Sequence, residues 1–139
     1  MKKIDTLDPV FRLKAETLLA KLRQQGQVFL PVQGRRTIAE QNALYAKGRT
    51  APGPRVTNAR GGQSPHNFGL AVDLCPVAKN GSLWWQAPDT LWRFLADQAK
   101  AQGLVPGYYF KSIYDPSHVE DPGWRKVRDL WRAGKITIP

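Results

Sequence analysis

The stretch Ser64-Pro-His-Asn-Phe-Gly-Leu-Ala-Val-Asp73 decides how this chain folds around a site. It holds His66, one of only two histidines in the sequence, and it ends on Asp73, a carboxylate inside a short apolar run. The second histidine, His118, lies in Asp115-Pro-Ser-His-Val-Glu120, between two more carboxylates. Both histidines therefore have acidic neighbours in the sequence.

Two neutral imidazoles and one carboxylate are a common ligand set for a catalytic zinc ion. Three protein ligands leave the fourth tetrahedral position open for water. A lone histidine is more often an ordinary polar residue with a hydrogen-bonded partner. Two histidines in matching acidic surroundings favour a zinc site over that simpler interpretation.

The segment before the motif predicts a long loop, because residues 49–65 contain too many glycines and prolines for a regular element. Long loops in compact domains are usually functional. Residues 70–74 then predict a strand, which would hold Asp73 on a rigid element. Cys75, the only cysteine, would share the face of Asp73 on that strand, either as a further metal ligand or, more in keeping with its residue type, as a buried thiol.

Capping residues and apolar periodicity predict the remaining elements. A first helix begins at Asp8-Pro9 and ends at Gly26, and a second begins at the Thr37-Ile-Ala-Glu40 capping box and ends at Gly48. Two more helices and three short strands complete the pattern: a helix capped by Asp89 and ending at Gly103, a helix starting at Asp121-Pro122, and strands at 27–32, 104–105 and 113–119.

Length and composition favour one soluble globular domain over residues 1–139. No apolar run approaches the roughly 20 residues that span a bilayer, and no secretory signal is visible, so we expect synthesis in the cytoplasm and no membrane insertion. Twenty-one Lys and Arg against eleven Asp and Glu give a net charge of +10, which favours polyanionic partners such as nucleic acid or bacterial envelope polymers. The charge is concentrated, because the stretch from Gln41 to Val72 has no acidic residue.

A hydrolytic zinc site also needs a carboxylate that accepts a proton from water. Asp115 would lie near the open metal position if it occupies a turn just before His118. Glu120 would share the face of His118 on a strand, where it could serve as the base or orient an imidazole. Spacing alone leaves both possibilities open. Arg36, just ahead of the second helix, is a candidate for stabilising negative charge or holding a substrate carboxylate.

The pattern SxHxxGxAxD over residues 64–73, followed by DxxH over residues 115–118, resembles the LAS group of zinc peptidases. That group includes VanY-type D-alanyl-D-alanine carboxypeptidases and phage L-alanyl-D-glutamate endopeptidases. The stretches at 34–50 and 56–60 are most similar to the phage endolysin branch. The similarity runs from about Phe29 to Glu120.

By position, the resemblance implies one zinc ion per chain and a small α+β fold, in which a short antiparallel sheet carries the metal site and helices pack around it. It implies that His66, Asp73 and His118 bind the zinc ion and that Asp115 is the general base. It also implies that Arg36 and Gln41 face the substrate and that Ser64 shapes the site. Glu120 is left as a residue that orients a ligand.

The activity implied is hydrolysis of the peptidoglycan stem peptide between L-Ala and D-Glu by a monomeric phage or prophage endolysin. Such an enzyme would act on the cell wall after release through a membrane damaged by a holin-type protein. The chain has no recognisable wall-binding module, so the positive charge itself could hold the anionic wall. Two departures from the family pattern, Val119 and Arg35 where aromatic residues are usual, bear on substrate fit.

Several alternatives remain. A D-alanyl-D-alanine carboxypeptidase would release terminal D-Ala. A non-catalytic zinc module would have no use for a base, which argues against it where both Asp115 and Glu120 are present. Nucleic-acid binding fits the charge and the aromatic pair Tyr108-Tyr109, but no recognition motif accompanies them, so we expect no nucleic-acid partner. A two-carboxylate muramidase mechanism would leave both histidines without a task.

Overall fold

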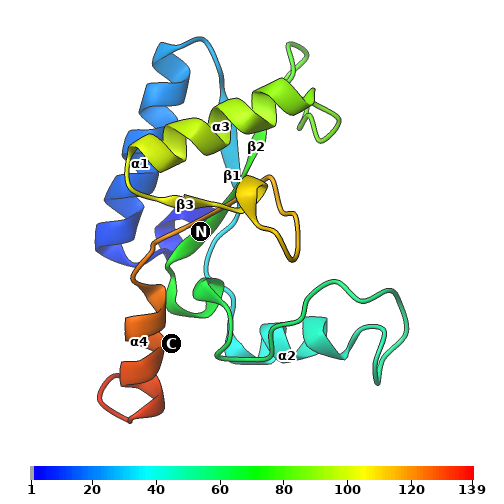
Figure 1. The fold of residues 1–139 in the computed structure, drawn as a ribbon, viewed down its shortest axis with the longest axis vertical. Helices are drawn as coiled ribbons and strands as arrows, with labels where there is room; N and C mark the ends of the chain where they lie inside the picture. The colour runs from blue at the N-terminus through cyan, green and yellow to red at the C-terminus, as the bar shows by residue number, and fades with distance from the viewer. Residues whose placement is uncertain (1) are drawn as a thin grey trace.

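The computed structural model describes residues 2–139. In it, four α-helices and four β-strands alternate along the chain with short 3₁₀ helices (Figure 1). The α-helices are α1 (Pro9–Gln24), α2 (Ile38–Ala46), α3 (Asp89–Ala101) and α4 (Trp124–Arg132). The strands are β1 (Phe29–Gln33), β2 (Ala71–Pro76), β3 (Val105–Pro106) and β4 (His118–Glu120), and the 3₁₀ helices are η1 (Lys3–Thr6), η2 (Pro65–Phe68) and η3 (Gly107–Tyr109).

The strands form one sheet in the order β1-β2-β4-β3, and every neighbouring pair is antiparallel. In the pairing of β2 with β4, Asp73 lies directly opposite His118. Directly opposed residues of an antiparallel pair have Cβ atoms only about 4.5–5.5 Å apart. The register of two central strands therefore brings together a carboxylate and an imidazole that are far apart in the sequence.

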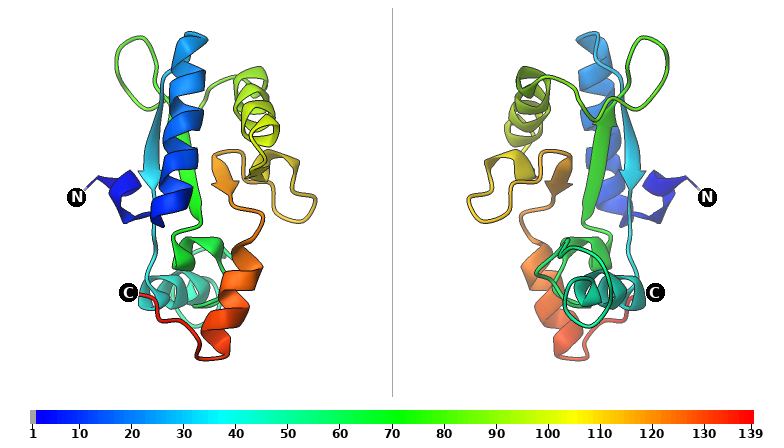
Figure 2. Two further views of the ribbon diagram at one scale, coloured as in Figure 1. Left: turned by 90° about the vertical axis from the view of Figure 1, so that its left-hand side faces the viewer. Right: turned by 90° about the vertical axis from the view of Figure 1, so that its right-hand side faces the viewer.

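Two helices cover one face of the sheet and contact each other. Figure 2 shows α1 and α3 on the same side, where α1 packs on β1 and α3 on β3. Their apolar stripes meet the buried side chains of the central strand, as helical periodicity requires. The fully or almost fully buried core residues include Phe11, Leu18 and Leu22 of α1, Val72 and Leu74 of β2, and Trp92 and Leu95 of α3.

A second group of elements, α2, η2 and α4, lies beyond one end of the sheet (Figure 1). Phe68 of η2 packs between two tryptophans of α4, with ring centroids 6.4 Å from Trp124 and 5.7 Å from Trp131. Gly62 has φ +85°, and a Cβ there would overlap the Trp131 ring. The last helix thus fixes the 3₁₀ turn that carries His66.

The expected α+β fold, with a short antiparallel sheet and helices around it, is confirmed, as are the caps of the first two helices. Asp8 accepts hydrogen bonds from Val10 and Phe11, and both halves of the capping box at Thr37 are present. The expected cap at Asp89 is wrong by one position, because Asp89 is the first helical residue and Pro88 precedes it.

The expected strand at 113–119 is confined to its last residues. The amide of His118 donates to the carbonyl of Asp115 at 3.1 Å, which closes a turn where the pattern predicted extended chain. The long loop ends at residue 64, because residues 65–68 form η2. None of the helices between residues 2 and 139 is long and apolar enough to cross a membrane.

Candidate metal centre

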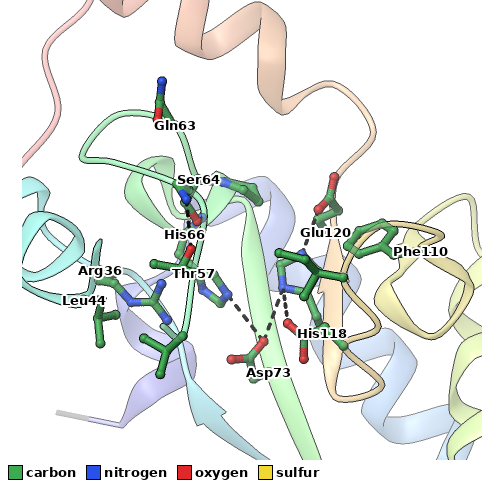
Figure 3. A pocket seen from close by; sticks show the side chains of 15 residues that line it. Arg36, Leu44, Thr57, Gln63, Ser64, His66, Asp73, Phe110, His118 and Glu120 are labelled. Carbon is green, nitrogen blue, oxygen red and sulfur yellow. Dashed lines mark hydrogen bonds and ion pairs between the residues drawn. The ribbon is translucent and has the colours of Figure 1, made fainter. Parts of the chain in front are cut away.

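Three side chains from three elements point at one another in the structure (Figure 3). Oδ1 of Asp73 lies 3.4 Å from Nε2 of His66 and 3.4 Å from Nδ1 of His118. The three ligand atoms all lie within 4.8 Å of one another. The residues expected to form the metal site are therefore brought together, on η2, β2 and β4.

Local hydrogen bonds hold His66 in place on η2. The Ser64 hydroxyl accepts from the amide of His66 at 3.2 Å. The buried Asn67 side chain accepts from the amides of Gly62 and Ser64 and donates to the carbonyl of Arg36. Asn67 thus holds the segments around His66 together, a role that was not apparent from the sequence. Its spacing from Ser64 is that of a capping box, with asparagine in the place of the usual acid or glutamine.

Hydrogen bonds at the outer ring nitrogens fix which nitrogen of each imidazole faces Asp73. Nδ1 of His66 donates to the carbonyl of Gly34 at 2.9 Å, and Nε2 of His118 donates to Oε1 of Glu120 at 2.7 Å. In the neutral rings, the lone pairs therefore lie on the two nitrogens that face Asp73. Metal-binding histidines almost always donate their other N–H in this way.

Both carboxylate oxygens of Glu120 accept hydrogen bonds, one of them from His118. Its second oxygen, Oε2, accepts from Nε1 of Trp124 at 2.8 Å, and the carboxylate is buried. It also lies at the opposite edge of the imidazole from the nitrogen that faces Asp73. These contacts favour the orienting role that the spacing left open for Glu120. The part played by Trp124, on α4, was not apparent from the sequence.

The environment of Asp73 fits a bound cation. Its Oδ1 atom is buried and has no hydrogen-bond partner, although two imidazole nitrogens lie 3.4 Å away. Burial alone would raise the pKa of Asp73, but the two imidazoles outweigh burial and lower it below its usual range. A donor set of two nitrogens and one carboxylate oxygen suits zinc and leaves a coordination position open.

Asp115 lies beside this cluster with its side chain half-exposed. Its Oδ2 atom is 3.9 Å from Nδ1 of His118, the nitrogen that faces Asp73. Burial raises the pKa of Asp115, and the Asp73 carboxylate raises it further. A raised pKa strengthens a carboxylate as a proton acceptor. The backbone position of Asp115 depends on Gly107, because a Cβ at residue 107 would overlap the Asp115 carbonyl oxygen.

Arg36 and Ser64 line the same cleft, which has a volume of about 350 Å³. Gln41 differs from its expected placement, because its side chain is fully buried and does not line this cleft. It accepts from Nη1 of Arg36 at 2.8 Å and donates to the carbonyl of Ala59 at 2.8 Å. Gln41 thus links the Arg36 guanidinium to the backbone of the loop between α2 and η2.

Cys75 has the expected character of a buried thiol. Its side chain is inaccessible, its Sγ donates to the carbonyl of Pro76, and burial raises its pKa. Among the described residues, the group that could hold a metal ion consists of His66, Asp73 and His118 and does not include Cys75.

Comparison with known proteins identifies the family. Residues 57–121 match the M15 peptidase family model that is described as D-alanyl-D-alanine carboxypeptidase. The chain is 36% identical over 121 residues to the peptidoglycan L-alanyl-D-glutamate endopeptidase CwlK of Bacillus subtilis strain 168, an alignment that covers 82% of this chain and 72% of CwlK. The chain belongs to the M15 peptidase family. It is a metallopeptidase.

Solved structures of other peptidases share the fold at lower sequence identity. The L-Ala D-Glu endopeptidase ChiX of Serratia marcescens superposes with a TM-score of 0.65 at 20% identity, covering 91% of this chain and 87% of that one. A vancomycin resistance D,D-pentapeptidase, VanY, in complex with Zn(II), superposes with a TM-score of 0.63 at 18% identity, covering 92% and 79%.

The protonation of His118 predicts a pH-dependent metal affinity. Burial alone would lower the pKa of His118, but its interactions with Asp73 and Glu120 outweigh burial and raise it to about 9. Below that pH, a metal ion must displace a proton from Nδ1. Zinc affinity should therefore fall about tenfold for each pH unit between about pH 8 and about pH 6, as measured by chelator competition. An affinity that stays constant over this range would contradict this account of His118.

Proposed function

We propose that this metallopeptidase is a zinc-dependent endopeptidase that cleaves the peptidoglycan stem peptide between L-Ala and D-Glu. The observation that carries the proposal is the cluster of His66, Asp73 and His118 with the half-exposed Asp115 carboxylate beside it. The choice of bond is supported by the 36% identity to CwlK, whose name gives that specificity.

Zinc would be held by Nε2 of His66, Oδ1 of Asp73 and Nδ1 of His118. When bound, it would supply a water of lowered pKa and polarise the scissile carbonyl. The ligand geometry depends on the hydrogen bonds that the two rings donate to the Gly34 carbonyl and the Glu120 carboxylate, which keep both imidazoles in the required tautomer.

Asp115 carries out the proton transfers. Oδ2 of this residue accepts the proton from the attacking water and then delivers it to the amine of the leaving peptide. The guanidinium of Arg36, held by Gln41, faces the cleft and stabilises the negative charge that develops on the carbonyl oxygen. Both residues line the cleft and lie outside the group of three ligands.

A D-alanyl-D-alanine carboxypeptidase is the second candidate. It is supported by the description of the family model that matches residues 57–121. The two activities differ in their products, because a carboxypeptidase releases single D-Ala residues and leaves the stem peptide attached to the glycan. A non-catalytic zinc module is disfavoured by the accessible carboxylate of Asp115, which a purely structural site would not need.

Mass spectrometry of products released from purified peptidoglycan tests the proposal. The protein is assayed untreated, after chelation, and after chelation followed by resupply of zinc. We expect peptides that begin with Glu, released only when metal is present. Release of free Ala alone would favour the carboxypeptidase, and no product from protein that still binds zinc would favour the non-catalytic module.

The substitution Asp115→Asn tests the role of the base in the same assay. The amide cannot accept the proton, so we expect a loss of activity of about 10²–10⁴-fold with zinc content unchanged. Because Asp115 is placed outside the ligand set, retention of zinc separates loss of the base from loss of the metal site. Full activity of this variant would contradict the assigned role.

We further propose that the enzyme acts as an endolysin of phage or prophage origin. The net charge of +10 supports contact with an anionic wall. The prediction is that bacteria expressing the chain in their cytoplasm lyse when a holin-type protein is co-expressed, and that cells expressing the Asp115→Asn chain with the same holin lyse far more slowly. Lysis at the same rate with both chains would contradict a role for this activity in lysis.

A further inference from the structure

The cleft of the metal centre continues into a second compartment. The first compartment, of about 350 Å³, contains the metal ligands, and the second has a volume of about 430 Å³. Five residues line both, Thr57, Ala59, Gln63, Phe110 and Ile113, so the two are parts of one groove. One wall comes from the long loop between α2 and η2, and the other from the segment between η3 and β4.

The two compartments differ in charge. The metal compartment is lined by three carboxylates, those of Asp73, Asp115 and Glu120, together with Arg36. Among the described residues that line the second compartment, Arg125 is the only one with an ionised side chain. In the first compartment, an anionic group of a bound substrate therefore meets carboxylates that compete with it for Arg36 and the metal ion. In the second compartment it meets Arg125, with no acidic side chain in the lining.

Arg125 is positioned to meet such a group. It lies in the first turn of α4, and its guanidinium stacks over the Trp124 ring at 4.7 Å from the centroid. None of the ion pairs formed by residues 2–139 includes Arg125. Stacking on a buried aromatic ring restricts the side chain while leaving its N–H donors free, and a guanidinium can bind a carboxylate through two parallel hydrogen bonds.

We propose that the second compartment is a subsite for an acidic segment of the substrate, and that Arg125 binds a carboxylate that lies away from the scissile bond. This inference rests on the proposed peptidase function and extends it to substrate selection. It implies that the enzyme prefers peptides with free carboxylates beyond the D-Glu residue over peptides in which those groups are amidated.

The test compares two substitutions in one helix. Arg125→Gln removes the cation from the groove. Arg128→Gln is a matched control, because Arg128 also stacks over Trp124, at 5.4 Å from the ring centroid, but does not line either compartment. The substrates are two synthetic peptides containing the L-Ala-D-Glu bond, one with free carboxylates beyond D-Glu and one with those carboxylates amidated.

For the acidic peptide, Arg125→Gln should raise KM about tenfold with kcat unchanged, in line with the loss of a charge-assisted hydrogen bond. The KM for the amidated peptide should not change, and Arg128→Gln should resemble the unsubstituted protein with both peptides. Equal effects of the two substitutions, or equal effects of Arg125→Gln on the two peptides, would overturn the proposal.

A binding measurement separates this inference from the proposed function. Calorimetry on chelated protein, with folding checked by circular dichroism, reports affinity for the same two peptides without turnover. Weaker binding of the acidic peptide to Arg125→Gln alone supports the subsite even if no peptide is cleaved. Cleavage by the unsubstituted protein with no such difference in binding or KM would leave the peptidase intact and reject the subsite.

Discussion

The structure depends on the contact between one buried carboxylate oxygen and two imidazole nitrogens. Oδ1 of Asp73 has no hydrogen-bond partner, yet it is fixed 3.4 Å from a ring nitrogen of each histidine. Burying an unpaired charged oxygen is costly unless a cation compensates it. The antiparallel register of β2 with β4 enforces this arrangement, in which either a proton on His118 or a metal ion can compensate the charge of Asp73.

Distant parts of the chain support this contact. Gly34, after β1, holds His66, while Glu120 and then Trp124 of α4 hold His118. The same Trp124 packs near Phe68 of η2 and lies beneath the guanidinium of Arg125 at the end of the groove. One aromatic side chain thus links the orientation of the His118 imidazole to the wall of the groove. Packing in α4 and chemistry at the metal centre are therefore coupled.

The features that could be predicted from the sequence are those set by local rules. The caps at Asp8 and Thr37 and the position of Asp73 on a strand follow from residue type and spacing, and the resemblance in motif added the ligand set and its family. What could not be predicted depends on contacts between distant segments. The burial of Gln41 behind Arg36, the bond from Trp124 to Glu120 and the continuation of the cleft to Arg125 all arise from tertiary packing.

His66, Asp73 and His118 are proposed to form a zinc site together. X-ray absorption at the zinc edge of the zinc-loaded protein tests it most directly. We expect scattering from two imidazoles and from oxygen ligands, with one imidazole lost in His66→Gln. A zinc–sulfur contribution at about 2.3 Å, which could come only from Cys75 or the single methionine, or a spectrum unchanged by that substitution, would contradict it.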